Sequence, residues 1–238
     1  MQVRRRAAQV VKRHRAGVTI IELMVATAVM TVLIMMSIPS VVEWNDNQRL
    51  KGTVRDAADL FQQARAESIR TGRNHVVFFG NPGVLDPSNN PVEVAGSWVP
   101  VLLIDDGPPA TANCAIDAGE ALRWIDPVPV GNVTWGVTRA TAAVPTDDGT
   151  ALFDYTNTGW DGATFADPAG TKINWVMFRP DGIPVVFSGA VGSCGTVGSI
   201  GRGGGALYIT NGKRDYGAVL SPLGAVRVHA FDGSQWTD

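Results

Sequence analysis

The chain of 238 residues has little of what catalytic and metal sites are made of. It contains two cysteines and the three histidines His14, His75 and His229, and none of them stands at the short spacing that a zinc site requires. Three motifs are also missing: G-x-S-x-G, the phosphate loop G-x-x-x-x-G-K-[ST], and the EF-hand pattern. We therefore expect a protein that is not an enzyme and that needs neither a cofactor nor a metal.

Acidic residues are absent from the first 17 positions, which hold six of the 20 basic side chains. The remainder has 14 basic against 22 acidic residues, a net charge of −8. Such an acidic body is a poor partner for nucleic acid, which is bound through Lys and Arg. The basic end is typical of the cytoplasmic flank of a membrane segment. The many glycines (27) and prolines (14) favour a turn-rich, β-rich globular remainder.

Charge is also absent from the 20 residues between Leu23 and Val42. As a helix this run would span roughly 30 Å, the thickness of a bilayer's hydrocarbon core. It is longer than the apolar region of a cleaved secretory signal, about 7–15 residues, and no Ala-x-Ala site follows it. We predict a single anchor whose N-terminus is cytoplasmic, with a bend at Pro39.

Glu22 stands at the start of this apolar run. A carboxylate at mid-bilayer costs on the order of 2.5–3.5 kcal/mol, and less near the end of the span. Glu22 either reaches back to the lipid headgroups or meets a cation supplied by another chain. The residue alone does not decide between the two.

The stretch "AGVTIIELMVATAVMTVLIMMSIPS" resembles the prepilin signature of type IV pilins and type II secretion pseudopilins. The resemblance implies that a prepilin peptidase cuts after Gly17 and that the new terminus, Val18, is methylated, although most members begin with phenylalanine there. Glu22 matches the glutamate that the family keeps as its fifth mature residue. Pro39 falls where pilins commonly have a helix-bending proline.

This resemblance gives Glu22 an assembly role. Cleavage after Gly17 would create an α-amine beside the bilayer, and in a packed filament the amine of one subunit can neutralise the carboxylate of the next. An unpaired buried charge costs several kcal/mol, so only correctly staggered subunits remove the cost. We therefore interpret Glu22 as the residue that sets the assembly register.

Beyond the anchor, residues 44–71 show helical periodicity that Gly72 should end. The apolar stripe consists of Leu50, Val54, Ala57, Phe61, Ala64 and Ser68, widened by Leu60 and Ile69. After Gly72 we predict short strands separated by turns. They are 75–79, 98–104, 120–125, 132–137, 173–178, 184–189, 206–210, 216–221 and 225–231. The glycine-rich stretch 189–205 is predicted to be a mobile loop.

These patterns predict an α+β, pilin-like fold in four parts. A basic leader (1–17) is cleaved, a transmembrane and filament-core helix (18–42) continues into an amphipathic helix (43–72), and a β-rich head (73–238) lies outside the inner membrane. Ala64, Arg65, Glu67, Arg70 and a glycine opening the last strand, Gly224, resemble the GspH/FimT subgroup of H-type pseudopilins and FimT/FimU-like minor pilins.

The two cysteines, Cys114 and Cys194, fall in two loops of this head. Because an exported head meets an oxidising environment, we expect them to form a disulfide. The alternative is two separate buried thiols. The region from Gly224 to Arg227 also matches a DNA-uptake element of some FimT-like pilins, G-R-x-R, but Ala225 replaces its first arginine.

The sequence thus predicts a structural minor pilin or pseudopilin. We expect it in the bacterial inner membrane and then in a filament, at or near the tip, supporting assembly and either secretion or motility and adhesion. Its expected partners are other pilins, the prepilin peptidase and the assembly platform. The alternatives are a FimT-like DNA-binding pilin, with Arg202, Lys213 and Arg214 as a basic patch, and a plain single-pass anchored envelope protein.

Overall fold

The computed structural model describes residues 17–80, 83–85, 90–94, 97–108, 112–125, 133–145, 162–189, 194–201 and 204–237. The chain divides into two compact units, Met1–Glu43 and Trp44–Asp238, which are described separately. Residues 1–16 of the predicted leader lie outside the described residues.

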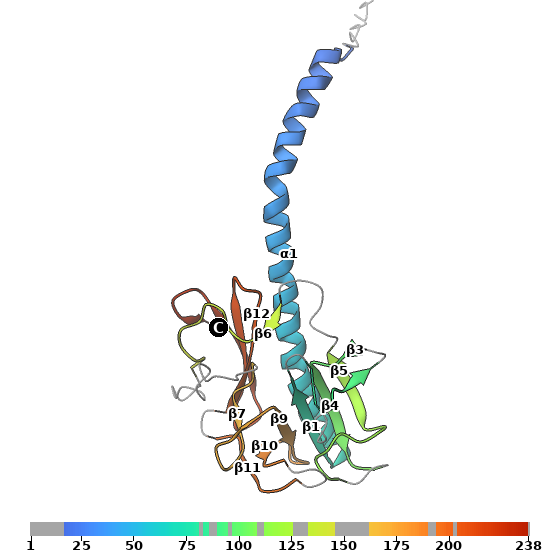
Figure 1. The fold of residues 1–238 in the computed structure, drawn as a ribbon, viewed down its shortest axis with the longest axis vertical. Helices are drawn as coiled ribbons and strands as arrows, with labels where there is room; N and C mark the ends of the chain where they lie inside the picture. The colour runs from blue at the N-terminus through green and yellow to red at the C-terminus, as the bar shows by residue number, and fades with distance from the viewer. Residues whose placement is uncertain are drawn as a thin grey trace, which may run out of the picture. The chain divides into compact units, whose positions relative to one another are not determined.

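The first unit consists of the N-terminal part of helix α1 (Ile20–Thr71) and the residues before it (Figure 1). Thr19 caps the helix, because its hydroxyl accepts the backbone N–H of Glu22 at 3.3 Å. Inside the apolar run, the hydroxyls of Thr27, Thr31 and Ser37 donate to backbone carbonyls one turn earlier. These hydroxyls therefore need no water, which suits a membrane environment. The helix assignment continues through Pro39.

The part of α1 that belongs to the second unit buries the predicted stripe. Seven residues of the stripe are at most 2% exposed: Leu50, Val54, Ala57, Leu60, Phe61, Ala64 and Ser68. The inclusion of Ile69 was wrong, since its side chain is 55% exposed. Gly72 follows the helix with φ +68° and donates its N–H to Ser68 O at 3.0 Å, so the predicted stop is confirmed.

Six antiparallel strands form the larger sheet, in the order β11-β10-β9-β1-β4-β5. The strands are β1 (Asn74–Phe79), β4 (Val101–Asp106), β5 (Ala121–Ile125), β9 (Trp175–Phe178), β10 (Pro184–Phe187) and β11 (Val197–Ser199). Both faces of its central strands are buried. Val77 and Phe79 of β1 face the helix, while Val76 and Phe78 belong to a second core on the outer face.

Five antiparallel strands form the smaller sheet, in the order β15-β14-β13-β12-β6. The strands are β6 (Thr134–Trp135), β12 (Gly205–Thr210), β13 (Asp215–Leu220), β14 (Val226–Phe231) and β15 (Trp236–Thr237). Two short hairpins complete the head: β2 (Glu93–Val94) with β3 (Ser97–Trp98), and β7 (Phe165–Ala166) with β8 (Lys172–Ile173).

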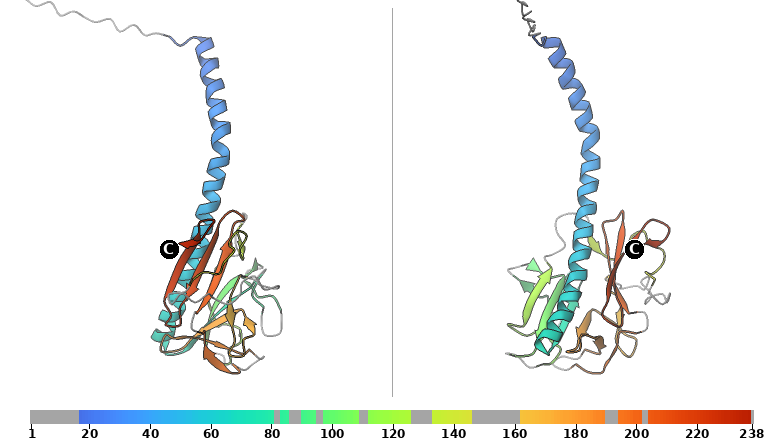
Figure 2. Two further views of the ribbon diagram at one scale, coloured as in Figure 1. Left: turned by 90° about the vertical axis from the view of Figure 1, so that its left-hand side faces the viewer. Right: turned by 180° about the vertical axis from the view of Figure 1, so that it is seen from behind.

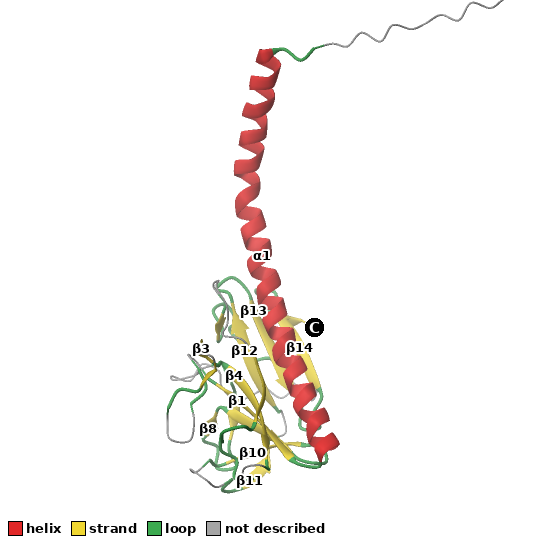
Figure 3. Cartoon of the chain, turned by 90° about the vertical axis from the view of Figure 1, so that its right-hand side faces the viewer, coloured by secondary structure: helices red, strands yellow, loops and turns green. Residues whose placement is uncertain are grey.

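The main core of the head lies where α1 packs against both sheets (Figure 2, Figure 3). Phe61 contributes the central ring, at 5.7 Å from the ring of Phe79 and 6.4 Å from that of Phe165. From the smaller sheet, Leu207 and Ile209 face the same core. The helix stripe is thus the element that joins the two sheets into one head.

The predicted α+β fold, a long N-terminal helix with a β-rich head, is confirmed. All nine predicted strand segments contain strand residues, although some are shorter than expected. The prediction of a mobile loop over 189–205 was wrong in part. β11 lies inside it and pairs with β10 through Val185↔Ser199, Val186↔Gly198 and Phe187↔Val197, so backbone pairing overrides the glycine-rich composition.

Candidate functional site

The predicted processing site lies directly before α1. Gly17, Val18 and Thr19 precede the helix, all three are exposed, and Glu22 lies in its first turn. Thr19 and Glu22 have the spacing of a capping box, in which Thr and Glu satisfy each other's backbone N–H groups, and the first half of that exchange is present. The helix dipole also favours an acid here. Thr19 therefore caps the helix, a role that the sequence interpretation missed although the T-x-x-E signal was visible.

Among the described residues of the first unit, none covers the apolar surface that follows. The described large apolar side chains from Ile20 to Val42 are between 54% and 81% exposed. Among the described residues, α1 is the one helix that is long and apolar enough to cross a membrane. Apolar surface of this extent needs lipid or other apolar helices around it.

In the head, the two sequence elements that resemble the GspH/FimT subgroup contact each other. Arg65 of α1 donates through Nη1 to the carbonyl of Gly224 at 3.2 Å, across 159 residues of sequence. Gly224 has φ +81° and packs against the carbonyl of Gly182, so only a glycine fits well. Glu67 and Arg70 form an ion pair at 2.6 Å on the surface of the helix. The Arg65–Gly224 contact fixes the end of α1 to the turn that opens β14 (Val226–Phe231).

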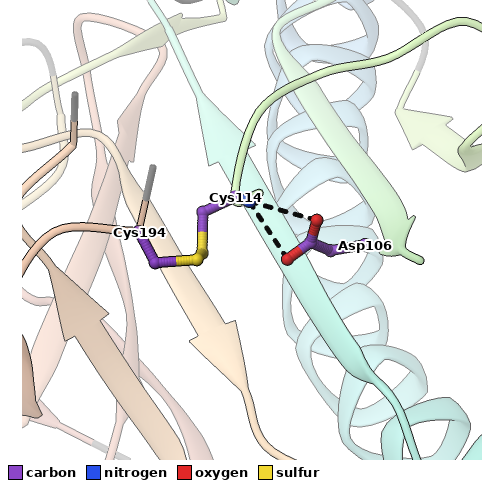
Figure 4. Close-up of side chains that lie close together, drawn as sticks. All are labelled: Asp106, Cys114 and Cys194. Atoms are coloured by element: carbon purple, nitrogen blue, oxygen red, sulfur yellow. Dashed lines mark hydrogen bonds between the residues drawn. A yellow bond between two sulfur atoms is a disulfide. The ribbon is translucent and has the colours of Figure 1, made fainter. Parts of the chain in front are cut away.

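A disulfide joins Cys114, in the loop between β4 and β5, to Cys194, in the loop between β10 and β11 (Figure 4). Their Cα atoms are 5.0 Å apart, and 80 residues separate them in sequence. Asp106 lies beside them, with a carboxylate oxygen within 4.8 Å of both sulfurs. Because the two sulfurs are bonded to each other, neither is available as a thiolate to a metal ion.

A buried ionisable group lies where β1 pairs with β4. His75 is fully buried, and its Nε2 lies 3.9 Å from Oδ1 of Asp105, where neither atom has a hydrogen-bond partner. The other ring nitrogen, Nδ1, contacts the carbonyl of Arg73, whose guanidinium pairs with Asp105. Burial lowers the pKa of His75, although the carboxylate of Asp105 partly opposes the shift.

Two carboxylates near the disulfide are also buried. Burial raises the pKa of Asp106, and the backbone N–H groups of Asn113 and Cys114 partly oppose this. Burial likewise raises the pKa of Glu120, against a backbone N–H from Asp117. Both carboxylates accept backbone N–H groups, and within the described ranges no cationic side chain donates a hydrogen bond to them, which is typical of loop-capping carboxylates.

The structure separates Arg227, the arginine of the Gly224–Arg227 element, from the described residues of the predicted basic patch. Arg227 is exposed on β14, opposite Val219 near the end of β13 (Asp215–Leu220). Lys213 and Arg214 lie in the turn that precedes β13, so most of this strand separates them from Arg227. Arg202 lies outside the described residues.

Comparison with known proteins adds one match. Residues 12–38 match the prokaryotic N-terminal methylation motif, the type IV pilin-like prepilin signal. No curated protein and no solved structure matches the chain. The motif covers Gly17, Val18 and Glu22, and together with the apolar helix it fits anchoring in the inner membrane. It supports a type IV pilin-like subunit of a pilus or pseudopilus, which implies processing by a prepilin peptidase and assembly with other pilins.

Proposed function

We propose that the chain is a structural, non-enzymatic minor subunit of a type IV pilus or of a type II secretion pseudopilus, of the GspH/FimT kind. The observation that carries the proposal is the methylation motif over residues 12–38, followed by a helix with an uncovered apolar surface. The contact between Arg65 and Gly224 supports the assignment to this subgroup. The two residues come from the two sequence elements that resemble it, and together they attach α1 to the turn before β14.

Assembly follows from charge and apolar surface. Removal of residues 1–17 takes the basic leader away and leaves the amine of Val18 close to the start of α1. In the filament, this amine meets Glu22 of a neighbouring subunit while the apolar helices cover one another. The ion pair forms only at one stagger of the helices, so charge neutralisation selects the register and apolar packing supplies the stability.

The head is displayed outside the inner membrane and acts at or near the tip of the filament. Support comes from its size and its long loops, since a subunit near the tip has fewer lateral neighbours to restrict them. DNA binding is not favoured, because Arg227 and the pair Lys213–Arg214 stand at opposite ends of β13.

The decisive experiment separates a charge-pairing role of Glu22 from a capping role of the same side chain. Glu22→Gln removes the charge but keeps a side chain that completes a capping box equally well, whereas Glu22→Ala removes both. Thr19→Ala is the matched control, because it removes the cap and keeps the charge. Incorporation into filaments is measured in cells that assemble the native structure, with membrane levels of each variant as the reference.

Charge pairing predicts that Glu22→Gln and Glu22→Ala both reduce incorporation at least about tenfold, since a neighbour's amine is left unpaired at a cost of about 2–5 kcal/mol. Thr19→Ala should change it less than about threefold. Normal incorporation of Glu22→Gln together with loss in Glu22→Ala would show that Glu22 only caps its own helix, and the assembly role would be wrong.

A further inference from the structure

The disulfide joins two loops that lie over the outer face of the larger sheet. Cys114 is 5% exposed and belongs to the second core, with its Sγ 3.8 Å from Sδ of Met177 on β9. The bridge ties the β4–β5 loop to the β10–β11 loop, and β9 and β1 lie between β4 and β10 in the sheet. It thus spans the outer face, where apolar side chains such as Phe78 and Leu102 would otherwise meet solvent.

The backbone at Cys114 is unusual. Its φ is +58°, and it is the one residue other than glycine with a positive φ among the described residues. The left-handed conformation costs a side-chain-bearing residue about 1–2 kcal/mol, so other contacts must hold it.

Asp106 supplies these contacts (Figure 4). Its Oδ1 accepts the N–H of Asn113 at 2.8 Å, and its two oxygens each lie 3.1 Å from the N–H of Cys114. The residue is 1% exposed, although a buried carboxylate is costly unless it is well hydrogen-bonded. The chain therefore keeps an acid in an apolar place where it orients the turn that carries the cysteine.

The carboxylate is held independently of the bridge. Asp106 is the last residue of β4 and pairs with Asn74 of β1, so its backbone is held in the sheet between neighbouring strands. Cys114, in contrast, lies in a loop eight residues later. Because the acceptor is held in the sheet while Cys114 lies in a loop, Asp106 is the residue that positions Cys114, and not the reverse.

We propose that Asp106 is a positioning residue for oxidative closure of the head: its buried carboxylate folds residues 113–114 into the left-handed turn before the bond forms and presents Cys114 to Cys194. The oxidant is a disulfide of a small molecule or a protein. One cysteine thiolate attacks it and releases one thiol, and the other cysteine then displaces the second thiol. Two protein thiols thus become one disulfide, while the oxidant's disulfide becomes two thiols.

The test uses the full chain purified in detergent and equilibrated with mixtures of oxidised and reduced glutathione, after which free thiols are trapped with a maleimide. Asp106→Asn keeps the size of the side chain but replaces one acceptor oxygen by a donor. Asp232→Asn is the matched control, because Asp232 also accepts two backbone N–H groups, from Ser234 and Gln235, in the β14–β15 turn.

Asp106→Asn should shift the equilibrium at least about tenfold towards the reduced form, and Asp232→Asn less than about twofold. Equal equilibria for Asp106→Asn and the wild type would overturn the proposal. Hydrogen exchange measured in the Cys194→Ser variant is a second test of the proposal, and it does not require that Asp106→Asn folds. If Asp106 forms the turn without the bridge, the amides of Asn113 and Cys114 stay within about tenfold of their protection in the bonded protein; exchange at the rate of an unstructured chain would contradict this.

Discussion

The contact between Arg65 and Gly224 gives a quantitative prediction, because a second glycine provides a matched control. Gly224→Ala places a methyl group 3.1 Å from the carbonyl oxygen of Gly182 and 3.2 Å from Cδ and Nε of Arg65. Gly212, in the turn between β12 and β13, has nearly the same φ, +78° against +81°, but nothing lies within 4 Å of a methyl group there. The two substitutions therefore share the backbone cost and differ in the contacts.

The backbone cost of a positive φ is about 1–2 kcal/mol, and alanine returns about 0.4–1 kcal/mol by restricting the unfolded chain. Gly212→Ala should then lower the free energy of unfolding by about 1 kcal/mol. Gly224→Ala also displaces Arg65, whose charged hydrogen bond contributes about 1.5–3 kcal/mol. Its total should be about 2–4 kcal/mol, which lowers Tm by about 6–12 °C in a head of this size.

Thermal unfolding of the full chain in detergent, followed by tryptophan fluorescence, measures both variants. All seven tryptophans lie from residue 44 onwards, so the signal reports on the head. In an Arg65→Ala background, Gly224→Ala should cost less than in the wild type, because the displaced side chain is already gone. Equal losses of Tm for Gly212→Ala and Gly224→Ala would contradict this prediction, since the Arg65 contact would then contribute nothing to stability.

Three further predictions concern the head. Phe61→Ala should lower the free energy of unfolding by about 3–5 kcal/mol in denaturant titrations, because Phe61 is the central ring of the main core, whereas exposed Gln62→Ala should change it by less than about 0.5 kcal/mol. Replacing both Cys114 and Cys194 by serine should cost about 2–4 kcal/mol, because a bond closing a loop of 80 residues restricts the unfolded chain by up to ~4.5 kcal/mol; an unchanged Tm would contradict this. The pKa of His75 is lower in the folded protein than in the unfolded chain, so the unfolded chain binds more protons. The free energy of unfolding should therefore decrease as the pH falls from 6.5 towards the folded-state pKa. The slope of Tm against pH in this window should be smaller in His75→Asn, and an identical slope would show that His75 does not cause it.

The sequence predicted best what depends on local pattern. The uncharged run from Leu23 to Val42, the stripe from Leu50 to Ser68 and the helix stop at Gly72 are all set by neighbours within a few turns. Strand positions were also largely predictable, because apolar runs and turn residues alternate along the head. β11 was missed because it is short, with one apolar side chain, Val197, and lies in a glycine-rich stretch.

What the sequence did not show depends on pairs far apart in the chain. Nothing near Asp106 in the sequence indicates its role, because the backbone of Cys114 comes within hydrogen-bond distance of its carboxylate only in the fold. Arg65 and Gly224 were recognised as two separate elements, and only the fold shows that they touch. The capping role of Thr19, in contrast, is local, and the T-x-x-E spacing with Glu22 indicates it.

The most direct test of the whole account is the intact mass of the protein recovered from membranes of cells that produce it with their own prepilin peptidase. We expect a chain that begins at Val18, carries one added methyl group on its terminal amine and retains the disulfide between Cys114 and Cys194. A chain of full length that still begins at Met1 would contradict it, because no amine would then be present to neutralise Glu22 of a neighbouring subunit.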